Sequence, residues 1–91
     1  MKREPIREGD IVLSRAGRDS GRAFVVTSLI DDNYVLLVDG QLRTIDRPKK
    51  KKRMHLLKAS EARMELSGHL LDADFRKFLT AQGYPNNRKN Q

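Results

Sequence analysis

Cysteine and tryptophan are absent from the 91 residues, and only five residues are phenylalanine or tyrosine. Without cysteine the chain has no disulfide, no thiolate chemistry and no cysteine-based zinc site. A reducing compartment fits this composition, and we expect a cytoplasmic protein. His55 and His69 are the only histidines and lie far apart in the sequence. The sequence therefore predicts no metal site and no other cofactor.

Long apolar runs are also missing. None approaches the roughly 20 residues that a membrane-spanning helix requires. The first ten residues, MKREPIREGD, lack the apolar centre of a signal peptide. We therefore expect a soluble protein without a membrane partner. A chain of this length forms one small domain with a modest core, which leaves little room for a substrate cleft.

The residue patterns of common catalytic sites do not occur either. The close carboxylate pairs at 31–32 and 72–74 each have a structural reason, in a turn or at the start of a helix. None of the serines lies in a nucleophile elbow, and the chain has no Walker phosphate-binding loop. The sequence thus predicts a protein that is not an enzyme and has no small-molecule substrate.

Positive charge is abundant, and its excess is confined to one stretch. The whole chain carries a formal net charge of +7, and residues 43–58, RTIDRPKKKKRMHLLK, carry +7 by themselves. Such a local excess indicates contact with a polyanion, nucleic acid before an anionic membrane surface. A solvated charge run or a flexible basic tail is the simpler alternative. We disfavour it because apolar residues flank the run closely, from Leu42 and Ile45 to Met54 and Leu56.

Short apolar segments separated by turn residues predict a small, mostly β domain. The expected strands are 11–16, 23–30, 34–38, 41–45 and 54–57. Two glycines between the first two strands predict a tight turn over 17–22. Asp39-Gly40 is a hairpin signal before the fourth strand, and Pro48 ends that strand ahead of the lysines. Strands joined in this way can curl into a barrel with few free edges.

The pattern becomes helical after Ala59. We expect one helix over 61–66, after Ser60, and a second from Asp72 as its N-cap to about Gln82. Along the second helix an apolar stripe should cover the strand at 34–38, although docking of a partner is an alternative use. The stripe consists of Phe75, Phe78 and Leu79.

The predicted organisation is a lead-in over 1–8, a barrel over 9–58, a helical extension over 59–85 and a polar tail over 86–91.

One segment resembles a known motif. Gly9-Asp10-Ile11-Val12 is followed by residues 14–22 and then by Phe24-Val25-Val26. This run closely resembles the KOW motif of ribosomal proteins and transcription-elongation factors, with its hallmark glycine at Gly21. The likeness covers roughly residues 6–58. There it is similar to the eukaryote-type fourteenth family of large-subunit ribosomal proteins, and still more to short bacterial KOW-domain RNA-binding proteins.

The resemblance implies a fold and a mode of binding. The fold would be a mostly β, small SH3-like (KOW) five-stranded barrel with a C-terminal helical extension. The glycine-bearing loop between its first two strands would contact RNA. Arginines on such a turn suit phosphate contacts, because the bare backbone permits close approach and guanidinium groups grip phosphate oxygens in pairs. The turn alone could equally explain the glycines and leave the arginines as ordinary surface.

Basic residues of this loop and of the charged stretch are the predicted RNA-binding residues. They are Arg15, Arg18, Arg22, Arg43, Arg47, Lys49, Lys50, Lys51, Lys52, Arg53, His55 and Lys58. Four consecutive lysines stand where the ribosomal proteins mix arginine with apolar residues, which favours affinity over sequence reading. Scarce aromatic residues argue against a stacking platform for single-stranded bases.

We therefore expect a protein that binds structured RNA, ribosomal RNA first, with the large ribosomal subunit as a partner. The alternative is a KOW-type protein-interaction module in the transcription or translation machinery. Attachment to anionic lipid is disfavoured, because the apolar or lipid anchor that usually accompanies a polybasic run is missing.

Overall fold

The computed structural model describes residues 5–86, which form a mostly β fold. Its strands are β1 (Asp10–Ser14), β2 (Ala23–Leu29), β3 (Tyr34–Val38), β4 (Lys49–Lys52) and β5 (Leu56–Arg63). A short 3-10 helix, η1 (Arg53–His55), joins β4 to β5. One α-helix of the described residues, α1 (Asp72–Ala81), follows the sheet. The mostly β class predicted from the sequence is confirmed.

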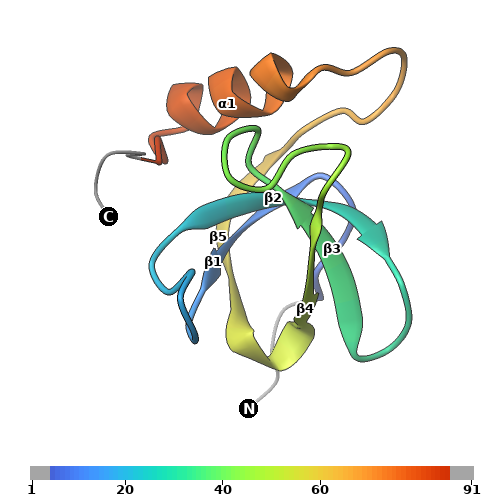
Figure 1. Cartoon of the computed structure of the whole chain (residues 1–91), viewed down its shortest axis with the longest axis vertical. Coiled ribbons are helices and arrows are strands. Elements are labelled where there is room, and N and C mark those ends of the chain that lie inside the picture. Colours follow the sequence, from blue (N-terminus) through green and yellow to red (C-terminus); the bar gives the residue numbers. More distant parts are fainter. Residues whose placement is uncertain (1–4, 87–91) are drawn as a thin grey trace.

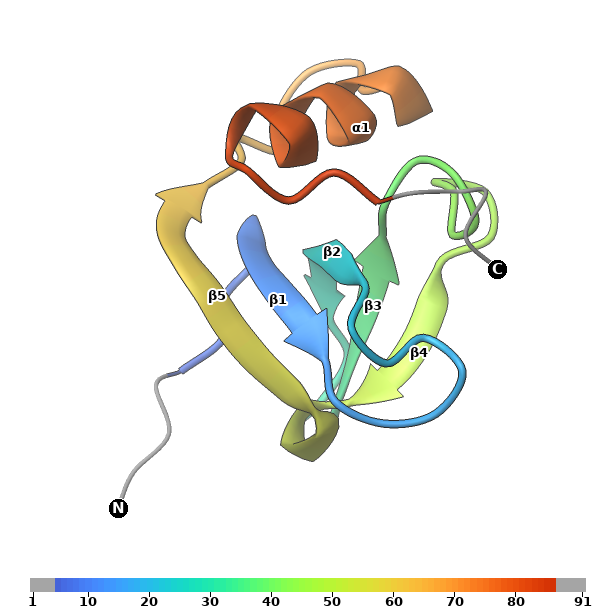
Figure 2. The same ribbon diagram turned by 90° about the vertical axis from the view of Figure 1, so that its left-hand side faces the viewer.

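All five strands lie in one antiparallel sheet in the order β4-β3-β2-β1-β5 (Figure 1). In a flat sheet the two edge strands would lie about 19 Å apart, four strand spacings of about 4.8 Å. The chain from Lys52 to Leu56 spans at most about 14 Å. The sheet is therefore strongly curled (Figure 2). It stays open, because no ladder joins β4 to β5 within residues 5–86.

Two apolar clusters hold this sheet, one on each face. The first consists of Ile6, Val12, Phe24, Val26, Val35, Leu37 and Leu56. The second consists of Ile11, Ala23, Val25, Val38, Met64, Phe75 and Leu79. Alternate residues of β1 and β2 enter opposite clusters, as the two-residue period of a strand requires. Both faces of these two strands are therefore covered, and α1 lies across one end of the sheet (Figure 1).

The apolar stripe of α1 is part of the core, as predicted. Phe75 and Leu79 are each 2% exposed, and Phe78 packs against the second cluster. The sequence predicts that the stripe covers the strand at 34–38, which is β3. The structure differs, because Val38 is the one residue of β3 in the second cluster. Hydrogen bonds fix this position: Arg76 Nη1 donates to the Gly40 carbonyl at 2.7 Å. The helix therefore covers mainly β1 and β2.

The start of α1 is organised by two carboxylates. The Asp74 carboxylate accepts a hydrogen bond from the Leu71 N–H at 2.8 Å. This bond gives a partner to the backbone N–H of the residue that precedes the first turn. Asp72, predicted to be the N-cap, instead accepts the Ile45 N–H at 2.8 Å. The bounds of the helix are thus close to the predicted ones, whereas the capping residue was wrong.

The predicted strand over 41–45 is wrong, and the lysine run itself forms the fourth strand. Asp39 Oδ1 accepts the backbone N–H groups of Gln41 and Arg43, both at 2.9 Å, and folds this segment into a turn. Residues 39–48 thus form a long connection where Asp39-Gly40 predicted a tight hairpin. Leu42, read as part of the strand, is 57% exposed.

The predicted helix over 61–66 is also wrong, because β5 continues to Arg63. Arg63 is paired with Asp10 of β1, and the Met64 N–H donates to the Gly9 carbonyl at 2.8 Å. Pairing with β1 overrides the local helix preference of this segment. The sheet therefore passes the predicted barrel boundary at 58, and the helical extension over 59–85 reduces to α1. Residues 54–55, predicted as strand, belong to η1.

The two ends of the chain lie partly outside the described residues. Residues 1–4 of the predicted lead-in and 87–91 of the predicted polar tail are not described. Within the described part, Ile6 is buried in the first cluster and Asn86 is hydrogen-bonded to β2.

Candidate nucleic-acid interface

The basic loop, residues 15–22, is a hydrogen-bonded turn between β1 and β2. Its backbone is closed by bonds from Ser20 N to Gly17 O at 3.1 Å and from Gly21 N to Ser14 O at 2.9 Å. Gly17 and Gly21 have φ angles of 78° and 88°, a region that residues with a side chain rarely adopt. The turn by itself thus requires both glycines, and the loop has a defined shape before any ligand arrives.

The basic loop touches the charged stretch of the sequence. Lys51 Nζ donates to the Ala16 carbonyl at 2.9 Å, and the Arg15 N–H donates to the His55 carbonyl at 2.8 Å. These bonds join the loop to β4 and to η1. Two segments that are more than 30 residues apart in sequence are thereby held side by side.

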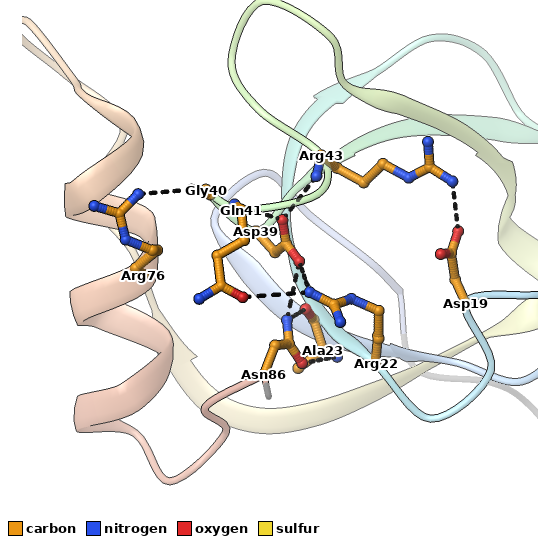
Figure 3. Close-up of polar contacts among 9 residues, drawn as sticks. All are labelled: Asp19, Arg22, Ala23, Asp39, Gly40, Gln41, Arg43, Arg76 and Asn86. Carbon is orange, nitrogen blue, oxygen red and sulfur yellow. Dashed lines mark hydrogen bonds and ion pairs between the residues drawn. The ribbon is translucent and has the colours of Figure 1, made fainter. Parts of the chain in front are cut away.

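Arg22, at the end of the loop, faces the interior. Its Nη2 lies 2.5 Å from Asp39 Oδ2, and the carboxyl side chain of Asp39 is 0% exposed (Figure 3). Asn86 Nδ2 donates to the same oxygen at 3.1 Å. Asn86 also bonds both the N–H and the carbonyl of Ala23. Arg22 thus compensates a buried negative charge at the point where the tail, β2 and the 39–48 connection meet.

Arg43 has a similar role on the other side of this network. Its Nη2 lies 3.2 Å from Asp19 Oδ2, and Asp19 is 6% exposed (Figure 3). The pair ties the basic loop to the 39–48 connection. Among the predicted RNA-binding residues, Arg22 and Arg43 are therefore the two whose guanidinium groups are held by buried carboxylates.

The four lysines of β4 alternate in exposure, as strand residues do. Lys50 and Lys52 are exposed, while Lys49 and Lys51 are half-buried. Lys50 is paired with Leu36 and Lys52 with Tyr34, so these side chains share one face of the sheet. The strand therefore shows which lysines point together, a question that the sequence leaves open.

The remaining predicted residues differ in exposure. Arg15, Arg18 and Arg47 are exposed, whereas Arg53, His55 and Lys58 are half-buried. Arg53 Nη2 donates to the Ile6 carbonyl at 3.4 Å, and Lys58 Nζ lies 3.8 Å from Glu61. We define the basic surface as the four exposed cations that are closest in sequence to the contact between the basic loop and β4. They are Arg15, Arg18, Lys50 and Lys52.

The turn between β2 and β3 positions Tyr34, an aromatic residue on the face that Lys50 and Lys52 share. Asp31 Oδ1 accepts the backbone N–H groups of Asn33 and Tyr34, at 2.8 and 2.9 Å. These bonds hold the pKa of Asp31 below its ordinary value, with a smaller contribution from the nearby charges of Lys50 and Arg53. Tyr34 is thereby fixed at the start of β3, opposite Lys52.

Sequence reasoning missed the residues that organise the interior network. The sequence predicts that Asp39 is a hairpin residue and that Asp19 belongs to a tight turn. Both are buried, at 1% and 6% exposure. A signal was present for Asp39, because it directly follows the buried end of an apolar strand. Nothing local in the sequence indicates that its partners are Arg22 and Asn86.

Within residues 5–86, no three histidine, aspartate or glutamate side chains gather closely enough to hold a metal ion. The described part of the chain also contains no helix that is long and apolar enough to cross a membrane. A comparison of the chain with protein-family models and with curated proteins found no match.

Proposed function

We propose that the protein is a non-enzymatic, cytoplasmic RNA-binding module that docks on structured RNA, with ribosomal RNA as its first target. The observation that carries the proposal is the bond from Lys51 Nζ to the Ala16 carbonyl, 2.9 Å long. It brings the basic loop against β4 on the side of Lys51, while Lys50 and Lys52 extend to the opposite side of the same strand. Two separate basic segments thus become neighbours on one small domain.

The fold that accompanies this function is a small SH3-like barrel of the KOW type. Three features support it: five antiparallel strands, a strong curl, and a return of β5 to the far side of β1. The glycine-bearing turn lies between β1 and β2, where the resemblance to KOW proteins expects it.

In this mechanism the basic surface neutralises phosphates of the RNA backbone. Arg15 and Arg18 can grip phosphate oxygens in pairs, while Lys50 and Lys52 act as point charges. Hydrogen bonds already hold the loop and β4 in place, so little conformational entropy is lost when RNA binds. A surface of fixed shape suits a folded RNA better than a flexible strand.

The alternative of a protein-interaction module loses one of its two grounds. Besides the protein binding of some KOW barrels, that hypothesis could draw on the stripe of Phe75, Phe78 and Leu79 as a docking face. Phe75 and Leu79 are 2% exposed and belong to the second apolar cluster. The stripe is thus used by the fold.

Two variants with the same net charge test the proposal. Lys50→Gln with Lys52→Gln removes two positive charges from the basic surface, and Lys77→Glu removes the same charge from the exposed side of α1. Filter binding to a structured ribosomal RNA fragment should show about a tenfold loss for the first variant and little change for the second. Both should keep the melting temperature of the parent, because exposed charges contribute little to stability.

Equal losses in the two variants would contradict the proposal, because they would show that only net charge matters. The RNA target needs a separate test. Crosslinking in cells followed by sequencing should enrich ribosomal RNA. A spread over messenger RNAs would contradict the assignment to ribosomal RNA, while leaving RNA binding itself intact.

A further inference from the structure

A pocket of about 560 Å³ lies beside the exposed face of β4. Its walls come from the segment before β1, from the turn between β2 and β3, and from the junction of β4 with η1. This volume falls within the range of small-ligand sites, roughly 300 to 1,000 Å³. The pocket is therefore large enough to receive one nucleotide.

The apolar part of this pocket includes an aromatic ring that the core does not use. Tyr34 lines the pocket and belongs to neither apolar cluster, in contrast to Phe24 and Phe75. Met54, which is 56% exposed, and Pro5 line it as well. A half-buried ring beside a thioether and a proline offers a flat, apolar surface of the kind on which nucleobases stack.

Positive charge surrounds the same ring. Lys50 Nζ lies 4.7 Å from the centroid of the Tyr34 ring. Lys52 is paired with Tyr34 across the β3–β4 ladder, and both Lys52 and Arg53 line the pocket. A nucleotide whose base contacts Tyr34 would therefore have its phosphate near two or three cations. Such a combination of ring and charge matches a nucleotide better than an apolar ligand.

Polar side chains complete the lining at the turn between β2 and β3. Asp32 and Asn33 belong to the pocket, and a carboxylate and an amide together offer acceptors and donors for the edge of a base. The Asn33 carbonyl accepts the Arg53 N–H at 2.7 Å, which ties this turn to η1. The two sides of the pocket are thereby held at a fixed separation.

We propose that this pocket binds one unpaired nucleotide of the RNA, with its base against Tyr34 and its phosphate near Lys52. The inference rests on the proposed RNA-binding function and deepens it. It revises the sequence-based expectation that base stacking plays no part, because Tyr34 belongs to neither apolar cluster. The protein would then prefer an RNA stem with a bulged nucleotide to an uninterrupted one.

The test compares two RNA hairpins of equal charge. One carries a single bulged nucleotide, and the other carries an abasic residue at the same position. The wild-type protein should bind the first about tenfold more tightly, since only the first offers a base for stacking. Tyr34→Ala should bind both equally, at the affinity of the wild type for the abasic hairpin. Tyr34→Phe should keep the preference, because it keeps the ring.

Different failures have different meanings. Equal binding of both hairpins by the wild type would overturn this inference and leave the proposed function standing. No binding to either hairpin would overturn both. A Tyr34→Ala variant that loses affinity for the two hairpins equally would also overturn the inference. Melting temperatures of the variants show whether they fold, and 4-thiouridine at the bulge should crosslink to the pocket; crosslinks confined to the basic loop would contradict it.

Discussion

Two groups of basic side chains, both predicted from the sequence to bind RNA, lie in opposite environments. Arg22 and Arg43 are bound to the buried carboxylates Asp39 and Asp19. The basic surface of Arg15, Arg18, Lys50 and Lys52 faces solvent. The first group lies against buried carboxylates, and within residues 5–86 the second does not. A count of positive charges along the chain therefore overstates the number that are available to bind a polyanion.

The interior group is expected to matter for stability and the exterior group for binding. A buried carboxylate is tolerated only when donors surround it, and Asp39 has them from Arg22, Gln41, Arg43 and Asn86. An exposed lysine has no such constraint, since water solvates it. Substitutions in the two groups should therefore produce effects that barely overlap.

The largest effect should follow removal of Asp39. Asp39→Ala leaves the Arg22 guanidinium without its partner and releases the turn at Gln41, so the free energy of unfolding should fall by about 3–5 kcal/mol. Urea denaturation measures the change. Asp46→Ala, at an exposed position in the same 39–48 connection, is the control and should stay within about 0.5 kcal/mol.

A loss at Asp39 no larger than at Asp46 would contradict the interior role of the network. Retained stability would mean that the carboxylate is not needed to compensate Arg22, and the division between the two groups would fail.

A paired comparison of arginines sharpens the same division. Arg43→Gln should lower the free energy of unfolding by about 1–2 kcal/mol, because Asp19 is buried and loses its partner. Arg18→Gln, in the basic loop, should leave stability unchanged and weaken RNA binding severalfold. Denaturation curves and filter binding should be measured for both variants. A loss of stability in Arg18→Gln together with unchanged stability in Arg43→Gln would contradict this division.

The smallest effect concerns the turn that positions Tyr34. The pKa of Asp31 is lowered in the folded state, so its carboxylate stabilises the protein above the pKa of the unfolded chain. This contribution is lost as the pH falls through the folded-state pKa. The stability advantage of the wild type over Asp31→Ala should therefore shrink on acidification. Thermal melts across the acidic range would detect it, and an advantage that grows with acid would be the opposite result.

The local parts of the fold were predictable, and the parts that depend on distant partners were not. Strands β2 and β3 and helix α1 carry their own apolar periodicity and turn residues, and their predictions are confirmed. Residues 61–66 have a helical pattern, but pairing of Arg63 with Asp10 makes that segment an edge of the sheet. A single sequence contains no local sign of this pairing.

The candidate site divides in the same way. Its charge and its position along the chain follow from the sequence alone. Which cations remain exposed depends on Asp19 and Asp39, which lie 24 and 17 residues from their partners. The alternation of the lysines could be seen only once β4 was known to be a strand, since a loop would impose no such period.

The salt dependence of RNA affinity tests the central claim most directly. If the basic surface engages about four phosphates, a plot of log affinity against log salt should have a slope of roughly −2.8 to −3.6. Lys50→Gln with Lys52→Gln should make the slope shallower by roughly 1.4 to 1.8, because two phosphate contacts are lost. A flat dependence for the wild type, or an identical slope for the variant, would contradict binding through the basic surface.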